Sequence, residues 1–459
     1  MRAELEIPFG IKEIYEITGA VFSDATEPSI TINAITTDTR ECKENDLFIA
    51  LNGENESGEK YVREALKKGC HVLSSSHQGG AISVNDTVEG LLKLAKAYKA
   101  KVAPRYTVAV TGSVGKSTTV KFISTILKEQ FKVHSTIGNF NNHIGVPLTL
   151  LSMPKDTEVL VIELGMNHVG EISRLSHTVN PDIGVITGIG TAHIGNLGSR
   201  KKIAEAKLEI RDGMNSNNLL LPASEPLVSN IPLALYVGRN SSLSSFTLND
   251  TDTDTYSFVS KARTINDIVF FDKREHLLSD LAMAISVADM LEMPEKDILS
   301  GIHAITHSDL RQRFIELTCF TIFDDSYNAS LESIEADLKY ISSLGRPTGA
   351  FLGDILELGD DAEPIHRQIG RIAAKLRIDH LYLYGEYSKY VYEGALEGGM
   401  DENNIFINCD ISSPRISIDH IRNNHTIGEI VLFKASHRLR LDKIADIMKN
   451  EERISNDKH

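Results

Sequence analysis

Apolar residues along the chain occur in short runs, separated by segments in which they recur at helical spacing. From Thr107 to about Arg311 the runs TVAV, EVLVIEL and DIGVIT are typical of buried parallel strands, and helical segments flank them. A second alternating stretch begins near Phe320 and contains the runs TIFDD, TGAFLGD, LYLYG and EIVLFKAS. Strands that alternate with helices in this way predict two doubly wound α/β units.

The part of the chain before these units mixes short apolar strands with a helix near Tyr61–Lys68. A longer helix follows, because five apolar residues then fall on one helical face: Val88, Leu91, Leu92, Ala95 and Tyr98. Asp86 and Glu89 have the spacing of a capping pair at its start, and Pro104 ends it. We interpret this helix as the connector into a second domain.

These patterns predict an α/β protein of three domains. They are a small N-terminal α/β domain over residues 1–85, a central parallel-sheet domain over residues 86–312, and a C-terminal Rossmann-like α/β domain over residues 313–459. Within the central domain, the polar stretch Asn240–Thr255 predicts loops and turns, and helical spacing returns across Leu277–Met290. The last eleven residues, KNEERISNDKH, predict a frayed tail.

Composition and charge narrow the class of protein. The 459 residues are 41% apolar and 24% charged, which is typical of a globular protein of two to four domains. The net charge of −15 argues against a nucleic-acid or anionic-membrane partner held by non-specific attraction. The four cysteines are far apart, so we expect reduced thiols in a cytoplasm. No stretch approaches the roughly 18 apolar residues of a membrane span, and the acidic start does not predict a signal peptide.

A glycine-rich segment, TGSVGKSTT, joins a predicted strand to a predicted helix. Backbone N–H groups at such a turn point at a phosphate, and the helix dipole favours its charge, so the central domain is expected to be P-loop ATPase-like. Lys116 can reach the outer phosphates, and the Ser117 hydroxyl can bind Mg²⁺. The predicted nucleotide contacts are Gly112, Ser113, Gly115, Lys116, Ser117 and Thr118. Alternatively, the glycines only make a tight connection, since Val110 stands where the longer consensus has glycine.

Three more residues are candidates beside this loop. Glu163 ends a buried strand, and the carboxyl ends of parallel strands border the ligand crevice, so a Mg²⁺ ligand is predicted there; the alternative is a helix cap. His193 and Lys207 would be given no role from pattern alone. A lone histidine is usually packed or on the surface, and a lone lysine on an amphipathic helix is usually solvated.

Seven motifs taken together resemble the Mur ligase family over nearly the whole chain. In order they are TGSVGKSTT, GNFNNHIGVPLTLL, ELGMNHVGEI, NPDIGVITGIGTAHIGNLGS, AKLEI, DDSYNAS and LGDILELGDDAEPIHRQIG. The N-terminal motifs ITTDTR, DLFIALNGEN and SGEKYVREALKKG are also similar to the family's uridine-nucleotide domain. No single motif is specific, but the ordered set is.

The resemblance implies roles for particular residues. Lys116 and Ser117 would hold the ATP phosphates and a first Mg²⁺, with Glu163 as a further ligand, and His193 would bind a second Mg²⁺. Lys207 matches a carbamylated lysine of the family, whose anionic oxygens can bind a metal that an ammonium would repel. Further implied nucleotide contacts are Asn142, Arg311, Asp325, Tyr327 and Asn328, and Lys434 and Ser436 match a late motif facing the cleft.

For function, the resemblance implies an ATP-dependent ligase that activates a carboxylate as an acyl phosphate and joins it to an amine. The implied substrates are a UDP-N-acetylmuramoyl-tripeptide and the dipeptide D-alanyl-D-alanine, used in peptidoglycan synthesis by a cytoplasmic monomer. Arg311 and the three residues Lys116, His193 and Lys207 would act in catalysis.

Several positions depart from the family pattern. Leu277 and Asp280 replace the two asparagines of a family motif that places an asparagine near the adenine, and Ser57 and Glu59 alter the N-terminal motif. The remaining departures lie in the third domain: Ser330 with Leu331, and Ala435, His437 and Asp442. They leave two alternatives open: a related ligase that joins a different acid or amine in another pathway, and a non-catalytic nucleotide-binding protein.

Overall fold

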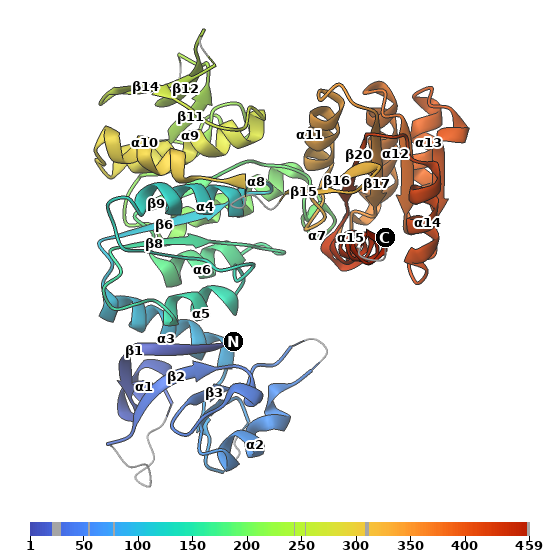
Figure 1. The fold of residues 1–459 in the computed structure, drawn as a ribbon. Helices are drawn as coiled ribbons and strands as arrows, with labels where there is room; N and C mark the ends of the chain where they lie inside the picture. The colour runs from blue at the N-terminus through green and yellow to red at the C-terminus, as the bar shows by residue number, and fades with distance from the viewer. Residues whose placement is uncertain are drawn as a thin grey trace.

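The computed structural model describes residues 1–20, 29–53, 56–76, 79–242, 244–252, 254–307 and 312–456, and side chains up to residue 452. It contains three sheets, each with helices packed against it (Figure 1). The sheets follow one another along the chain, so the predicted α/β fold class with three units is confirmed.

The first sheet has the strand order β1-β2-β3-β4-β5, in which β1 pairs antiparallel with β2 and the other pairs are parallel. Its helices precede α3 in the chain, and α3 leads into the central unit. The Asp86 carboxylate caps the first turn of α3, 2.7 Å from the backbone nitrogen of Val88. The elements are β1 (Arg2–Gly10), α1 (Ile11–Thr18), β2 (Thr31–Thr36), β3 (Leu47–Ile49), α2 (Val62–Lys67), β4 (His71–Ser74), β5 (Ile82–Ser83) and α3 (Thr87–Val102).

The central sheet has nine strands in the order β14-β13-β12-β11-β10-β9-β6-β8-β7, parallel except at the β12–β13–β14 end. Its strands are β6 (Tyr106–Thr111), β7 (Val133–Ser135), β8 (Val159–Glu163), β9 (Ile183–Ile186), β10 (Leu219–Pro222), β11 (Leu235–Arg239), β12 (Phe246–Asp250), β13 (Tyr256–Ser260) and β14 (Thr264–Ile268). Its helices are α4 (Lys116–Leu127), α5 (Gly145–Leu151), α6 (Glu171–Val179), α7 (Ile194–Leu197), α8 (Arg200–Leu208), α9 (Glu275–Met290) and α10 (Glu295–Ala304).

Strand β12 corrects one expectation, because the stretch Asn240–Thr255 was predicted to be loops and turns. Phe246 and Leu248 are buried in the core beside α9, while Asp250 at the strand end is exposed. The two apolar residues alternate with polar ones, which is the pattern of a half-buried strand. The surrounding Ser, Asn, Asp and Thr residues hid this short signal.

The third sheet has the order β15-β16-β20-β17-β18-β19, parallel except for the β15–β16 pair. Its strands are β15 (Arg313–Glu316), β16 (Phe320–Asp324), β17 (Thr348–Gly353), β18 (His380–Tyr384), β19 (Ile405–Asn408) and β20 (Glu429–Lys434). Its helices are α11 (Leu331–Ser342), α12 (Ala362–Lys375), α13 (Ser388–Glu397), α14 (Pro414–Asn424) and α15 (Leu441–Asn456). Short 3₁₀ helices occur between elements, among them Gly359–Asp361.

Helix α15 corrects the expectation of a frayed tail, because it continues through Asn456. The Glu451 carboxylate accepts hydrogen bonds from Arg415 and Arg422 of α14, each at 2.6 Å. The buried side chains of Leu441, Ala445 and Met448 pack against the third sheet. The polar sequence of the tail therefore carries ion pairs to a neighbouring helix.

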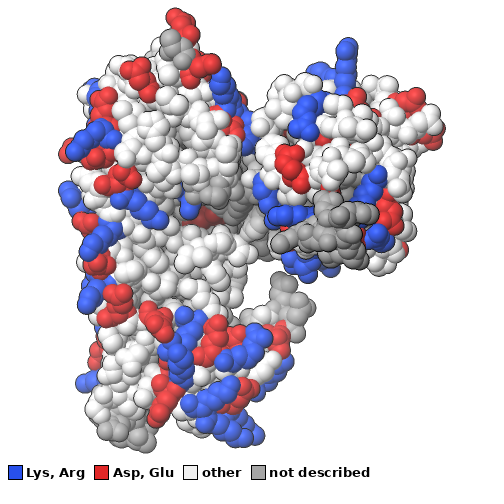
Figure 2. Space-filling model, viewed as in Figure 1, with Lys and Arg blue, Asp and Glu red and all other residues white. Residues whose placement is uncertain are grey.

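The central unit lies between the other two, with the third unit beside its upper part and the first unit below it (Figure 1). In space-filling view, a wide indentation beside the central unit separates the first and third units on the face shown (Figure 2). Within the described part of the chain, no helix has both the length and the apolar composition that crossing a membrane requires.

Candidate active site

The register of two parallel strands places Glu163 beside the glycine-rich loop. Strands β6 and β8 are neighbours, and Val110, the last residue but one of β6, is the partner of Glu163 at the end of β8. The loop leaves β6 immediately afterwards and leads into α4. Both chain segments therefore open at the same carboxyl edge of the sheet, where α/β proteins bind ligands.

Two glycines of the loop have no room for a side chain. A Cβ at Gly112 would lie 2.0 Å from the Thr187 hydroxyl oxygen, and one at Gly115 would lie 2.5 Å from Oδ1 of Asp280. Gly115 also has a left-handed φ of +80°. The backbone can therefore approach a phosphate closely at the N-terminus of α4, and the Lys116 ammonium lies over the loop, 2.9 Å from the Gly112 carbonyl oxygen.

The hydroxyl of Ser117 donates a hydrogen bond to Oε2 of Glu163, which is buried. The amide of Asn141 donates to the other carboxylate oxygen, Oε1, at 2.7 Å. Asn142, the predicted residue, instead uses its side-chain oxygen to accept from the Gly145 backbone at 2.8 Å, at the start of α5. Ser117, Glu163 and Asn141 therefore form one hydrogen-bonded cluster, while the Asn142 side chain bonds to the backbone at the start of α5.

Lys207 lies on α8 and is almost completely buried, with 2% of its surface exposed. Burial lowers its pKa well below the usual lysine value, and the positive charge of Lys116 lowers it further. The Glu163 charge acts in the opposite direction but is the weakest of the three effects. The alternative of a solvated surface lysine is thus wrong, and both burial and the charge of Lys116 disfavour the ammonium form of this side chain.

His193 precedes α7 and has a left-handed φ of 64°. Its Nδ1 lies 2.6 Å from Oε2 of Glu357, a residue of the third unit that the motif reading had not singled out. Burial lowers the pKa of His193; Glu357 opposes this shift, while the charges of Lys116 and Lys207 add to it. The Gly195 backbone nitrogen also donates to the Glu357 carbonyl oxygen at 3.0 Å. The segment around His193 therefore contacts the third unit through both the side chain and the backbone of Glu357.

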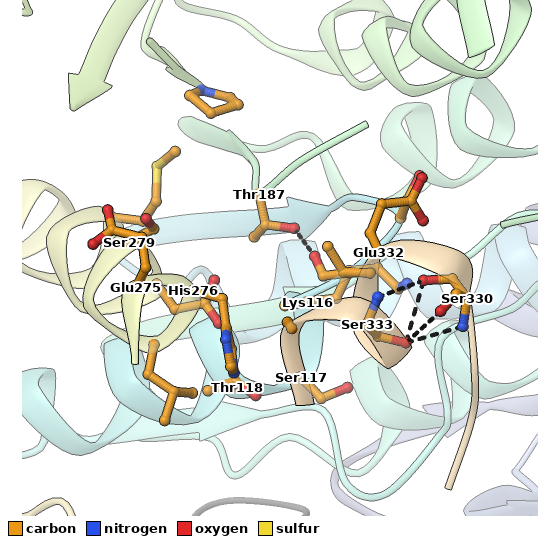
Figure 3. A pocket seen from close by; sticks show the side chains of 18 of the residues that line it. Lys116, Ser117, Thr118, Thr187, Glu275, His276, Ser279, Ser330, Glu332 and Ser333 are labelled. Atoms are coloured by element: carbon orange, nitrogen blue, oxygen red, sulfur yellow. Dashed lines mark hydrogen bonds between the residues drawn. The ribbon is translucent and has the colours of Figure 1, made fainter. Parts of the chain in front are cut away.

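A cavity of about 660 Å³ lies between the central and third units, and residues of both line it. Figure 3 shows Lys116, Ser117 and Thr118 on one side of it, and Ser330, Glu332 and Ser333 at the start of α11 on the other. The predicted residues that line it are Ser113, Gly115, Lys116, Ser117, Thr118, Asp325, Tyr327, Asn328 and Lys434. Arg311 lies outside the described residues, whereas Glu163, His193 and Lys207 are not among the lining residues.

Lys434 at the end of β20 is 1% exposed, and its ammonium contacts the carboxyl groups of two aspartates of the third unit. Its ammonium contacts the Asp325 carboxylate and lies 2.8 Å from Oδ2 of Asp337. Burial alone would lower its pKa, but the two carboxylates raise it, so the lysine is charged. The pKa of Asp337 is raised to about 8, chiefly by burial, whereas Lys434 keeps that of Asp325 low despite burial. The amide of Gln312 donates to both aspartates, at 3.1 and 3.2 Å.

Arg274, at the start of α9, joins the central unit to the same region. Its buried guanidinium pairs with Asp272 and donates a hydrogen bond to the side-chain oxygen of Gln312. It also lies over the ring of Tyr340 in α11, 4.5 Å from the centroid. No sequence motif had indicated this residue, which now connects two units through one side chain.

Two of the departures from the family pattern also have structural partners. Asp280 is buried below the loop and accepts a hydrogen bond from the Thr119 hydroxyl at 2.9 Å, and burial raises its pKa to about 8. Glu59 in the first unit accepts hydrogen bonds from the hydroxyls of three consecutive serines, Ser74, Ser75 and Ser76, at 2.6 to 2.8 Å. Both acidic side chains therefore accept hydrogen bonds from hydroxyl groups of their own unit.

The comparisons with known proteins agree with this architecture. A model of the Mur ligase middle domain matches residues 110–281. The UDP-N-acetylmuramoyl-tripeptide–D-alanyl-D-alanine ligase of Bacillus subtilis is 34% identical over 452 residues, which cover 95% of this chain and 97% of the relative. A crystal structure of MurF from Acinetobacter baumannii superposes with a TM-score of 0.87 at 25% identity, over 97% of this chain and all of that one. MurF from Thermotoga maritima in complex with ADP has the same fold, with a TM-score of 0.78 at 23% identity, over 92% of this chain and 98% of that one.

The chain belongs to the Mur ligase family. Within this family it resembles, along almost its entire length, the ligases named for adding D-alanyl-D-alanine to UDP-N-acetylmuramoyl-tripeptide, including one from Rickettsia prowazekii at 30% identity.

Proposed function

We propose that this protein is an ATP-dependent peptide ligase that adds D-alanyl-D-alanine to UDP-N-acetylmuramoyl-tripeptide in peptidoglycan precursor synthesis. The observation that carries the proposal is the cavity in which the phosphate loop of the central unit meets Asp325 and Lys434 of the third unit. A ligase of this class has to hold a nucleotide and two further substrates together. A cavity built by two units, next to a wide indentation, suits that task (Figure 2).

In the proposed reaction the tripeptide carboxylate attacks the γ-phosphorus of ATP, which gives an acyl phosphate and ADP. The dipeptide amine then attacks the acyl carbon, phosphate leaves, and a proton is lost from the new amide nitrogen. Lys116 and the backbone N–H groups of the loop orient the phosphates and offset their charge. This offset is needed because the attacking carboxylate and the phosphates are both anionic.

The donor set of the site fits magnesium. The Ser117 hydroxyl and the Glu163 carboxylate are in contact, and hard cations prefer such oxygen ligands. No group of three or more His, Cys, Asp or Glu side chains placed to hold a metal occurs among the described residues. Two Mg²⁺ ions, held by Ser117, Glu163, His193 and a modified Lys207, would supply electrostatic stabilisation when bound.

Lys207 fits the proposed carbamylation. The modification joins the lysine nitrogen to the carbon of CO₂ and releases one proton, so it requires a neutral amine. Burial favours that state, because it lowers the pKa of Lys207. The product is an anion that can bind a cation in a buried place where an ammonium would repel it. Its expected partners are the same metal ions that Glu163 and His193 would hold.

Closure of the third unit onto the central unit is the proposed gating step, because Asp325, Tyr327, Asn328 and Lys434 belong to one unit and the phosphate loop to the other. Asn142 and Arg311 remain proposed nucleotide contacts. The protein is proposed to act as a cytoplasmic monomer on small-molecule substrates.

The test is phosphate release from Mg-ATP with UDP-N-acetylmuramoyl-tripeptide, measured with and without D-alanyl-D-alanine. We expect release only when both substrates are present. Release with either one alone, or with other dipeptides in preference, would favour the related ligase with another acid or amine. Lys116→Ala should abolish turnover; amine-dependent turnover that survives in this variant would contradict the role of the loop.

A further inference from the structure

His193 lies in a segment of the central unit, residues 190–197, that docks against the third unit (Figure 1). At the start of this segment the Thr191 hydroxyl donates a hydrogen bond to Oε2 of Glu332 in α11, at 3.1 Å. The Ile194 side chain, which follows His193, packs against core residues of both units. The imidazole of His193 is therefore held at an interface between units.

The closest approach of the two backbones is at Gly195. Its nitrogen donates to the Glu357 carbonyl oxygen at 3.0 Å, and a Cβ here would lie 2.5 Å from the Gly359 backbone nitrogen. His193 and Glu357 both have a left-handed φ, of 64° and 63°. This conformation costs free energy in residues other than glycine, and such strain is typical of functional positions. Two strained residues thus meet across the interface, side chain to side chain.

The contact with Glu357 determines which ring nitrogen of His193 carries the hydrogen. The carboxylate can only accept, so Nδ1–H donates to Oε2 of Glu357 at 2.6 Å. In the neutral imidazole, Nε2 then keeps its lone pair, and the described part of the chain gives it no hydrogen-bond partner. Burial lowers the pKa of His193, and the charges of Lys116 and Lys207 lower it further, so the ring lies near the phosphate loop and another proposed ligand.

This arrangement is typical of histidines that bind metals. Such a histidine usually donates its second N–H group to a carboxylate or carbonyl, which fixes the ring orientation and makes the ligating nitrogen more basic. Glu163 has its supporting hydrogen bond from Asn141, within the central unit. The supporting group of His193 comes instead from the third unit, on the segment just before the 3₁₀ helix Gly359–Asp361.

We infer that Glu357 positions His193 as a ligand of a divalent cation, so that this cation site is complete only when the third unit is docked. The inference rests on the proposed function, in which His193 binds one of two Mg²⁺ ions. Glu357 is a positioning residue here, because it acts through the imidazole. Without the docked unit the ring can turn, and the cation binds more weakly. By linkage, a bound cation then favours docking to the same extent.

The experiment titrates Mn²⁺, a paramagnetic substitute for Mg²⁺, into the full-length protein in dilute bicarbonate. Free Mn²⁺ is measured by EPR, and pulsed EPR detects coupling to a histidine nitrogen. In Glu357→Ala the Kd of the nitrogen-coupled site should rise about tenfold or more. Glu357→Gln should retain part of the affinity, because its amide oxygen can still accept the Nδ1 hydrogen. Asp360→Asn, which removes an exposed charge three residues away, is the matched control and should keep the wild-type Kd.

Two further variants separate positioning from a purely structural contact. In His193→Ala the nitrogen coupling should disappear, and adding Glu357→Ala should weaken Mn²⁺ binding no further. Gly195→Ala places a methyl group against the third unit and leaves both side chains in place. It should weaken Mn²⁺ binding as Glu357→Ala does. A purely structural contact would instead lower thermal stability in Glu357→Ala and leave the Kd unchanged.

The opposite outcomes overturn the inference. Unchanged Mn²⁺ affinity in Glu357→Ala, or a further loss of equal size in the His193→Ala background, would show that Glu357 does not act through His193. Wild-type affinity in Gly195→Ala would remove the dependence on docking. Wild-type protein without nitrogen coupling would contradict the inference and the metal role of His193 together. The ligase reaction itself is judged separately, by phosphate release with both substrates in the same preparations.

Discussion

The regions around Lys207 and Lys434 differ in the charged groups that surround each lysine, and this difference sets the direction of each lysine's pKa shift. Both lysines are almost fully buried, at 2% and 1% exposure, and both lie next to the candidate active site. Around Lys434 two aspartates are in contact with the ammonium, and its pKa is raised. Around Lys207 the largest effect after burial comes from another cation, Lys116, and the pKa is lowered.

Burial alone therefore does not determine the charge of a lysine. It always disfavours the ammonium, and the contacting carboxylates decide whether this effect is overcome. The third unit thus holds a fixed positive charge at the cavity, while in the central unit the surroundings of Lys207 disfavour the charged form of its nitrogen. The first arrangement suits binding of anions, and the second suits reaction with CO₂.

The largest expected effect is on activity, in Lys207→Ala. If the neutral amine becomes the carbamate, its loss removes a metal ligand, and kcat should fall by about a thousandfold. Small carboxylic acids such as acetate should restore part of the activity, and intact-protein mass spectrometry under CO₂ should detect one added CO₂ in the wild-type protein only. Normal turnover in the variant would show that the two lysines do not differ in this way.

The next effect is on stability, in Lys434→Met. It leaves Asp325 buried without its cation, which should lower the free energy of unfolding by about 3–5 kcal/mol. Lys207→Met is the matched variant, and it should leave stability unchanged or raise it, because it removes a buried amine that makes no ion pair. Chemical denaturation followed by circular dichroism measures both. Equal destabilisation by the two changes would contradict the comparison.

Asp280 extends the comparison to a carboxyl group, since burial without a cation raises its pKa to about 8. Between about pH 4 and pH 8 the folded protein keeps a proton that the unfolded chain releases, so this group makes stability fall as pH rises through that window. Asp280→Asn cannot titrate. Its stability relative to the wild-type protein should therefore increase from pH 4 to pH 8 and level off above; a difference independent of pH would refute the assignment.

The smallest effect is expected in Asp337→Asn. Burial beside Asp325 raises the pKa of Asp337 to about 8, so it is already neutral at pH 7 and an amide preserves the charge balance around Lys434. The free energy of unfolding should change by less than about 1 kcal/mol. Asp325→Asn should cost clearly more, because Asp325 supplies the negative charge; a reversed order of the two variants would contradict this distribution of charge.

The parts of the site that could be predicted from the sequence are those encoded in one contiguous segment. A strand leads into the loop from Gly112 to Thr118, which contains two glycines and the start of a helix. Glu163 is the last residue of a clearly apolar strand. The pairing of β6 with β8 then brings the two together. The hydrogen bond from Asn141 to Glu163 could not be predicted, because it depends on which way the backbone turns before α5.

Contacts between separate units had no signal in the sequence. Arg274, Gln312 and Glu357 come from three different segments, and only the packing of the units brings Arg274 to Gln312 and Glu357 to His193. The same holds for the pKa of Lys207, since its helix looks amphipathic and only the fold shows that it is buried. Sequence periodicity indicates which face of a helix is apolar, but not which polar residue the neighbouring unit will cover.

The pairing of Val110 with Glu163 also limits how this protein can change in length. Side chains alternate between the faces of a strand, so inserting or deleting one residue within β8 would turn Glu163 to the opposite face, away from Ser117. Such a change would remove a metal ligand without altering a single residue of the loop. Length variation is therefore expected in the turns between strands, such as the one between β12 and β13, whose described residues Thr251, Asp252 and Asp254 are exposed.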